Sequence, residues 1–322
     1  MFDNEKPLVS ICCITYNHEK YIAQCLDGFL MQKTTFQFEI VISNDCSTDN
    51  TQRIIQEYVD KYPHIFRDIS PTENLGMNKN FYYTLTKCGG KYIAYCEGDD
   101  YWIDENKLQM QVDFLERNPD YGMCYTKTKQ YNQKVQKFCK KTFGSEVPGF
   151  EYLLSNGNWI PTLTTIFRKD LLDKYLSEIQ PRDKGWLMGD YPMWLFFSHE
   201  SKMMFFDKVT TVYRVLENSA SHFTDINKIV EFKKSIYEIM MFYDKYYNLS
   251  INFVWDENSQ FVRTAFIYGK RSELLLYDKP VVRTMDKAKL FLAKSSICFN
   301  ISLVLYKIFL KIVTFVKCLR GR

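Results

Sequence analysis

The chain has 322 residues, of which 46% are hydrophobic and 25% are charged. These are ordinary values for a globular protein of about two domains, so they exclude wholesale disorder. The net charge of +4 is too small to indicate a nucleic-acid partner, and we expect none.

The charge is divided unevenly along the chain. Residues 263–322 hold 13 Lys and Arg but only 3 Asp and Glu, a balance of +10. The remaining residues hold 42 − 13 = 29 basic and 38 − 3 = 35 acidic side chains, a balance of −6. The first seven residues have neither a basic nor an apolar signal region, so we expect a cytoplasmic protein. Ten cysteines without zinc spacing are typical of reduced, buried thiols.

Hydrophobic patterns predict strands and helices in alternation over the first 130 residues. Continuous apolar runs predict buried strands at Leu8–Ile14, Phe38–Ser43, Lys91–Cys96 and Gly122–Lys127. Helical spacing of apolar residues predicts helices at Tyr21–Met31, Thr51–Tyr62, Asn80–Lys87 and Lys107–Arg117. This order predicts an α/β fold with a mostly parallel central sheet flanked by helices.

Polar clusters follow three of the predicted strands. They are Thr15-Tyr16-Asn17, Asn44-Asp45 and Glu97-Gly98-Asp99-Asp100. Ligands of parallel sheets bind beyond the carboxyl ends of the strands. We therefore expect one binding site where these three clusters meet.

The residue types at these strand ends indicate a metal and a nucleotide. Glu97, Asp99 and Asp100 supply the carboxylate oxygens that Mn²⁺ and Mg²⁺ prefer. Tyr16 offers a flat ring to a base, and Asp45 offers an acceptor for a base N–H. The alternative for the Asp pair is an Asx turn that caps the next helix, and single residues like Tyr16 also serve in packing.

Four motifs together resemble the inverting family-two nucleotide-sugar glycosyltransferases, which have the GT-A fold. The motifs are Val9-Ser10-Ile11 with Thr15-Tyr16-Asn17, Val41 to Thr51, Asn74-Leu75-Gly76, and Tyr95 to Trp102. The resemblance is dense over residues 7–125 and thinner to about residue 215. It implies a nucleoside-diphosphate sugar as donor, and Mn²⁺ or Mg²⁺ as cofactor.

The resemblance also implies roles for single residues. Those assigned to the donor are Thr15, Tyr16, Asn17, Asp45, Lys79, Asn80, Glu97, Gly98 and Asp99. Asp99, Asp100 and His222 are the candidate metal ligands. The chain departs from the family at two places: Glu97 replaces an Asp, and the Arg-Asn pair that many members have after the third motif is absent. Lys79 and Asn80 are the candidates for its diphosphate contact.

A general base is expected in the second half of the domain, because an inverting transfer must deprotonate the acceptor hydroxyl. By resemblance this base is Asp190, in Gly189-Asp190-Tyr191, with Asp183 and Glu178 as fallbacks. Asp190 has the alternative role of capping a helix. The segment Trp159–Thr165 resembles the border of the acceptor site. Trp186 and Trp194 are candidates for stacking on sugars, with a place in the core as the alternative for each. Arg214 lies in a segment that resembles the end of the family's sequence pattern. In that segment an Arg or a His approaches the diphosphate of the donor.

The C-terminal region, 225–322, is predicted to be helical and separate from a GT-A domain at 1–224. Its predicted helices are Ile226–Tyr246, Phe253–Tyr268 and Lys287–Leu319. The longest charge-free run of the last helix has 12 residues, from Ser295 to Tyr306, whereas a spanning helix needs about 20. An amphipathic helix at the inner face of the cell membrane is favoured. Packing on the protein's own core or in a helical dimer remain alternatives.

These observations favour a metal-dependent inverting glycosyltransferase that acts on a glycan or lipid-linked acceptor in polysaccharide biosynthesis. We expect a UDP-sugar as donor and a peripheral position at the cytoplasmic membrane surface. A non-catalytic glycan- or nucleotide-binding scaffold is the main alternative. A nucleotidyltransferase is a further one, although such enzymes usually have a Gly-rich basic loop where this chain has Thr15 to Glu19.

Overall fold

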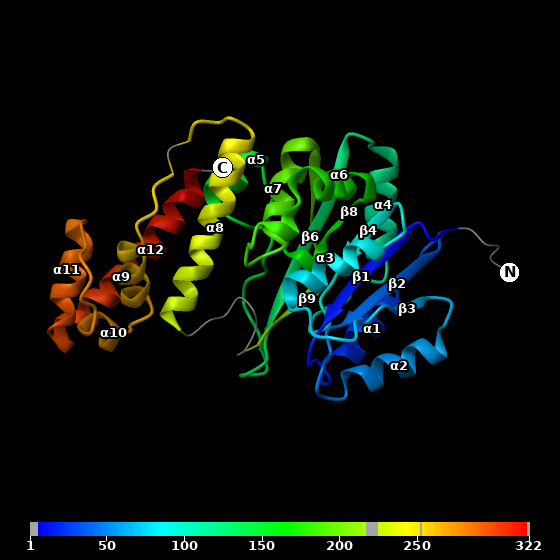
Figure 1. Ribbon diagram of the computed structural model, residues 1–322, viewed down its shortest axis with the longest axis horizontal. Helices are drawn as coiled ribbons and strands as arrows, with labels where there is room; N and C mark the ends of the chain where they lie inside the picture. Colours follow the sequence, from blue (N-terminus) through cyan, green and yellow to red (C-terminus); the bar gives the residue numbers. More distant parts are fainter. Residues whose placement is uncertain (1–5, 217–224, 252, 321–322) are drawn as a thin grey trace. The chain divides into compact units, whose positions relative to one another are not determined.

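The computed structural model describes residues 6–216, 225–251 and 253–320, with only the backbone for 311–320. The chain divides into two compact units, residues 1–217 and 218–322 (Figure 1). The first unit has a mixed sheet between layers of helices, and the second is helical.

The sheet of the first unit has the strand order β3-β2-β1-β4-β8-β6-β9-β5, with β7 paired to β6. The strands are β1 (Val9–Thr15), β2 (Phe38–Asn44), β3 (Phe66–Asp68), β4 (Tyr92–Tyr95), β5 (Tyr101–Trp102), β6 (Tyr121–Asn132), β7 (Lys137–Phe138), β8 (Ile166–Arg168) and β9 (Lys202–Val215). β3, β2, β1 and β4 are parallel, and β8 is antiparallel to both β4 and β6. The expected parallel sheet is therefore present in its first half, and strand directions are mixed in the second.

Helices cover both faces of this sheet. They are α1 (Ile22–Leu30), α2 (Thr51–Lys61), α3 (Met77–Lys87), α4 (Lys107–Arg117), α5 (Phe150–Asn156), α6 (Lys169–Ile179) and α7 (Asp190–Glu200). Short 3₁₀ turns lie at Thr162–Thr164 and Pro181–Asp183. Alternate residues of β1, such as Val9 and Ile11, share a core with Leu26 of α1 and Leu108 of α4. Because both faces are covered, β1 is buried along its whole length, as its unbroken apolar run predicted.

The second unit has five helices among its described residues. They are α8 (Ile226–Tyr246), α9 (Glu257–Ile267), α10 (Arg271–Leu275), α11 (Thr284–Ala293) and α12 (Ser296–Arg320). They share their own apolar core. None of the helices in the described part of the chain is long and apolar enough to cross a membrane.

The prediction of one helix over residues 287–319 was wrong, because the chain forms α11 and α12 there. The break falls at Lys294-Ser295. The Ser295 hydroxyl accepts a 3.3 Å hydrogen bond from the backbone N–H of Cys298, as a serine before a helix commonly does. A Ser-Ser pair within the apolar pattern was the available signal for this break.

Candidate active site

The register of the sheet brings the first two polar clusters together. Thr15 is paired with Asn44 at the ends of β1 and β2. The backbone N–H of Asp45 donates to the carbonyl of Thr15 at 2.9 Å. Asn17, with φ of 56°, turns back so that its Oδ1 accepts from the N–H of Thr48 at 2.8 Å. These bonds hold the two loops against each other.

Tyr16 and Asp45 have different surroundings at this edge. The Tyr16 side chain is 45% exposed, which leaves its ring available to a ligand. Asp45 is buried, and its two carboxylate oxygens accept from the N–H groups of Leu75 (2.7 Å) and Gly76 (2.9 Å). In this structure Asp45 therefore anchors the third motif, and its contact with a base stays a prediction.

The loop after β4 joins the same edge. The N–H of Gly98 donates to the carbonyl of Ile14 at 2.9 Å. A Cβ on Gly98 would lie only 2.5 Å from Oγ1 of Thr15, so this close approach requires glycine. The loop consequently places the flanking carboxylates beside the end of β1.

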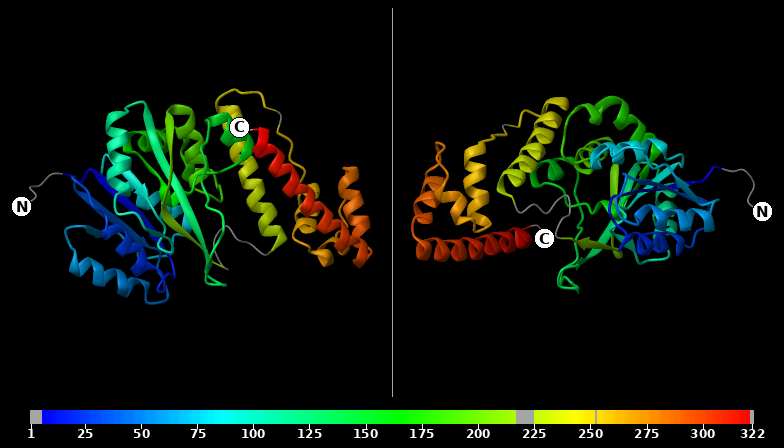
Figure 2. Two further views of the ribbon diagram at one scale, coloured as in Figure 1. Left: turned by 180° about the vertical axis from the view of Figure 1, so that it is seen from behind. Right: turned by 60° about the horizontal axis from the view of Figure 1, so that its bottom comes forward.

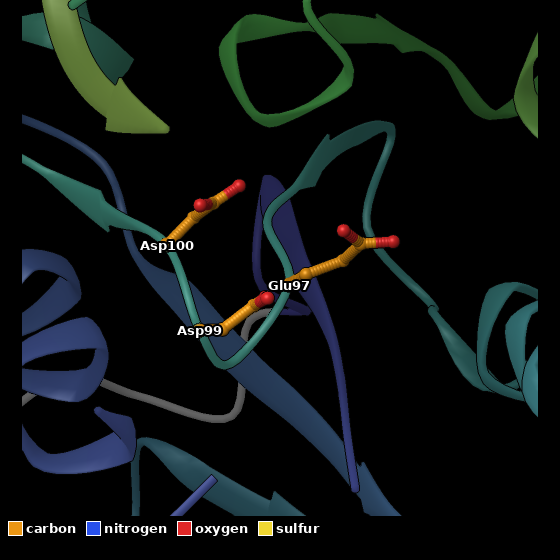
Figure 3. A group of neighbouring side chains, drawn as sticks. All are labelled: Glu97, Asp99 and Asp100. Atoms are coloured by element: carbon orange, nitrogen blue, oxygen red, sulfur yellow. The ribbon is translucent and has the colours of Figure 1, made fainter. Parts of the chain in front are cut away.

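Glu97, Asp99 and Asp100 form a carboxylate cluster on this loop (Figure 3). One oxygen from each lies within 4.8 Å of the others. Burial, with Asp99 and Asp190 nearby, raises the pKa of Glu97 to about 8. Burial and the negative charges of Asp99 and Glu97 also raise the pKa of Asp100. Three oxygen donors whose mutual repulsion a cation would relieve fit Mg²⁺ or Mn²⁺.

Two further side chains adjoin the cluster. Nε2 of His18 lies 3.9 Å from Oδ2 of Asp99, and its Nδ1 is 3.0 Å from the Thr15 hydroxyl. Burial lowers the pKa of His18. The backbone N–H of Arg214, near the end of β9, donates to Oδ1 of Asp100 at 2.7 Å, and its guanidinium donates to the carbonyl of Asp99. Sequence reasoning did not assign His18 a role, although it directly follows the first motif.

Asp190 is the first residue of α7, and its carboxylate is fully hydrogen-bonded. Oδ2 accepts from Nδ2 of Asn158 (3.0 Å) and from the hydroxyl of Thr162 (2.8 Å), and Oδ1 accepts from the N–H of Tyr191. Burial raises the pKa of Asp190. The negative charge of Asp190 also contributes to the raised pKa of Glu97, so the two carboxyl groups lie near each other. Nothing in the sequence pattern pointed to Asn158.

Two of the expected residues, Asn80 and Trp194, have other surroundings. Asn80 is 1% exposed, and its amide bonds both the hydroxyl and the carbonyl of Ser43, so it joins α3 to β2 instead of facing a ligand. Lys79 on the same helix is exposed. Trp194 is fully buried against Phe167 and Phe197, so it is not available for stacking on a sugar. His222 lies outside the described residues.

This arrangement of strand ends is shared with known proteins. A model of the family described as "Glycosyl transferase family 2" matches residues 10–176, just over half of the chain. The chain belongs to glycosyl transferase family 2. Its motif residues from Thr15 to Asp100 all fall within the matched family-2 region.

Relatives of this family-2 chain occur in several bacteria. The "Uncharacterized protein Rv1520" of Mycobacterium tuberculosis is 48% identical over 117 residues, which are 36% of this chain and 34% of the relative. The "Putative teichuronic acid biosynthesis glycosyltransferase TuaG" of Bacillus subtilis is 34% identical over 114 residues, 35% of this chain and 43% of the relative. The match thus spans only about a third to two fifths of these relatives.

Solved structures share the fold. The S. aureus TarS 1-349 structure with UDP-GlcNAc has a TM-score of 0.53 at 18% identity, covering 88% of this chain and 79% of that chain. The mannosyltransferase PcManGT from Pyrobaculum calidifontis, in complex with GDP-Man and Mn²⁺, has a TM-score of 0.52 at 12% identity, covering 94% and 88%. At these identities the similarity establishes the GT-A-like fold.

Proposed function

We propose that this chain is an inverting glycosyltransferase that transfers a sugar from a nucleoside-diphosphate donor to a hydroxyl group. The observation that carries the proposal is the meeting of three strand-end motifs at one edge, with the Glu97–Asp100 cluster among them and Asp190 near enough to raise the pKa of Glu97. Membership of family 2 supports the same reaction.

The donor is proposed to be a UDP-sugar that lies across the ends of β1, β2 and β4. Tyr16 stacks on the base, Asp45 with Thr15 and Asn17 shapes its pocket, and exposed Lys79 is the candidate for the diphosphate. A UDP-sugar in TarS and Mn²⁺ in the mannosyltransferase, which share this fold, support the donor class and the cation.

The residues proposed to hold Mn²⁺ or Mg²⁺ are Asp99 and Asp100, with Glu97 beside them. The bound cation supplies a Lewis acid for the departing diphosphate. Arg214 holds this loop in place through its bonds to Asp100 and Asp99. His222 remains a candidate ligand that the structure does not describe.

Asp190 is proposed as the general base. The acceptor oxygen attacks the anomeric carbon, its proton passes to the Asp190 carboxylate, and the bond from that carbon to the diphosphate breaks. Asn158 and Thr162 hold the carboxylate in one orientation. The raised pKa of Asp190 makes it a stronger base than an exposed aspartate.

The acceptor is proposed to be a glycan or lipid-linked glycan, in polysaccharide assembly at the cytoplasmic face of a membrane. The name of TuaG supports a place among enzymes of surface polymers. The basic C-terminal region supports a membrane position.

A panel of nucleotide sugars tests this function directly. Thermal stabilisation and donor hydrolysis are measured for each nucleotide sugar with Mn²⁺ and again with a chelator. We expect one UDP-sugar to stabilise the protein and to be hydrolysed only with the metal. The variant Asp99→Asn should lose both responses, whereas Asp60→Asn on α2 should keep them. If no nucleotide sugar has any effect, the proposal is wrong and the scaffold alternative is favoured.

A further inference from the structure

Over its described side chains, from Ser296 to Leu310, helix α12 has two apolar faces, and one of them packs on the core of the second unit. Phe299, Leu303 and Tyr306 follow each other at spacings of four and three residues and pack on the unit's core. The rings of Phe299 and Tyr306 lie 5.3 and 5.7 Å from that of Phe266 on α9. This inner face ties α12 to its own unit, as one of the alternatives from the sequence anticipated.

The opposite face of α12 is also apolar, and it is exposed. Its residues recur at helical spacing, and each is between 49% and 73% exposed: Ile297, Ile301, Val304, Leu305 and Ile308. At about 100° per residue they lie roughly opposite Phe299 and Tyr306. We call these five residues the outer face of α12; the helix is the long red ribbon in Figure 2. A continuous aliphatic surface of this size on a helix is typical of an interaction site.

The segment of the chain that contains α12 carries charge of one sign. From Lys287 to Arg322 the chain holds eight Lys and Arg and no Asp or Glu. Lys307 is exposed and lies at the side of the outer face, about 100° from Ile308 and about 60° from Val304 around the helix axis. From such a position a lysine reaches the polar boundary of an apolar phase while its stem stays in contact with that phase.

We propose that the outer face of α12 docks on an anionic lipid bilayer, with the helix lying in the plane of the interface. Aliphatic side chains then enter the acyl boundary while Lys307 and its basic neighbours meet anionic headgroups. This inference goes beyond the proposed transfer reaction. The outer face contains none of the residues of the candidate active site.

Charge favours the bilayer over a second copy of the chain. Two copies that meet through this face would bring two all-basic segments together, and like charges repel. An anionic surface instead gains from each basic residue near it. The outer face also consists of aliphatic side chains without a polar group, so it offers a partner no side-chain hydrogen bond, which suits the acyl boundary of a bilayer.

Co-sedimentation of the full chain with vesicles tests the proposal. The vesicles are phosphatidylcholine alone, or phosphatidylcholine and phosphatidylglycerol in equal parts. We expect binding to the anionic vesicles only, and weaker binding as salt is added. The double variant Ile301→Glu with Ile308→Glu should lower the partition coefficient at least about tenfold.

The matched control is Val254→Glu with Leu276→Glu, which adds the same charge at exposed apolar positions of the same unit. It should bind vesicles within about twofold of the wild type. Circular dichroism checks helix content, and Ile301→Asn with Ile308→Asn provides a second, uncharged outer-face variant.

Equal binding by the outer-face and control variants overturns the proposal. The proposal is also overturned if the wild type does not bind anionic vesicles. It is overturned as well if light scattering shows that the wild type is a dimer and that the outer-face variants are monomers. Donor hydrolysis by the outer-face variants is scored separately, so failure of docking is distinguishable from failure of the proposed reaction.

Discussion

The backbone N–H of Arg214 donates a 2.7 Å hydrogen bond to Oδ1 of Asp100, so the end of β9 holds the carboxylate cluster that follows β4. The Arg214 guanidinium also lies 4.4 Å from the centroid of the Tyr101 ring and bonds the side chain of Gln24. A segment more than a hundred residues away in sequence thus fixes the loop that carries Glu97, Asp99 and Asp100.

Replacement of Asp190 by Asn should abolish transfer while leaving donor binding intact. The amide keeps the size of the carboxyl group but cannot take the acceptor's proton, so we expect kcat to fall about 10²- to 10⁴-fold. Initial rates and nucleotide titrations measure the two effects. Asp170→Asn changes an exposed aspartate in the same way and should leave both unaffected. Undiminished turnover of Asp190→Asn would remove it as the base.

Activity should also fall as pH is lowered through the pKa of Asp190. Protonation removes the base, and burial raises this pKa, so the loss begins at a higher pH than for an exposed aspartate. The pH profile of kcat is the measurement, taken at saturating donor. A flat profile down to the usual pKa of aspartate, about 3.9, would contradict the assignment.

Truncation of Tyr16 should weaken nucleotide binding specifically. A base stacked on an aromatic ring gains about 1–3 kcal/mol, so Tyr16→Ala should raise the Kd for UDP roughly five- to 150-fold. Tyr16→Phe keeps the ring and should bind within about threefold of the wild type. Calorimetric titration decides between them. An Ala variant with the wild-type Kd would show that the base lies elsewhere.

Addition of a methyl group at Gly98 should destabilise the first unit. The new Cβ would lie 2.5 Å from Oγ1 of Thr15 and 2.9 Å from Cδ1 of Ile22, so the core must shift, at a cost of about 1–3 kcal/mol. Urea unfolding measures the loss. Gly89→Ala is the control, because its new Cβ would make only an ordinary contact, 3.8 Å from Oε1 of Glu39. Equal stability of the two variants would show that the loop tolerates crowding.

Lys107 should make stability rise with pH. It is fully buried over the Trp102 ring, 4.2 Å from the centroid, and burial lowers its pKa to about 7. Below about pH 7 the lysine is charged in both states, and the folded state carries the full cost of the buried charge. Between about pH 7 and 10.5 the unfolded chain alone holds the proton, so this cost declines as pH rises.

Lys107→Met should therefore stabilise the protein by up to a few kcal/mol at about pH 6 and by much less at about pH 10. Urea unfolding followed by tryptophan fluorescence at both pH values measures this difference. Lys20→Met replaces an exposed lysine and should show no such dependence. A gain for Lys107→Met that is the same at both pH values would show that packing, and not charge, is responsible.

Much of the first unit was predictable because its buried strands read as unbroken apolar runs. The edge formed by Thr15, Asp45 and Asp99 could be predicted because each lies in a polar cluster that directly follows an apolar run, and the carboxyl ends of parallel strands meet at one edge of a sheet. The partners of Asp190 did not follow, because Asn158 reaches it across 32 residues and amide side chains carry no periodic signal. The buried state of Asn80 depends likewise on the packing of α3 against β2, and the break before α12 depends on one serine hydroxyl.

The way Asp45 holds the third motif determines how freely each position there can vary. The Asp45 carboxylate accepts hydrogen bonds from the backbone N–H groups of Leu75 and Gly76, so these bonds do not depend on which side chain stands at position 75. Gly76 has φ of 79° in open space, which restricts it by backbone conformation and not by crowding. In a library of random substitutions, position 75 should therefore accept many residues, whereas positions 45 and 76 should retain Asp and Gly.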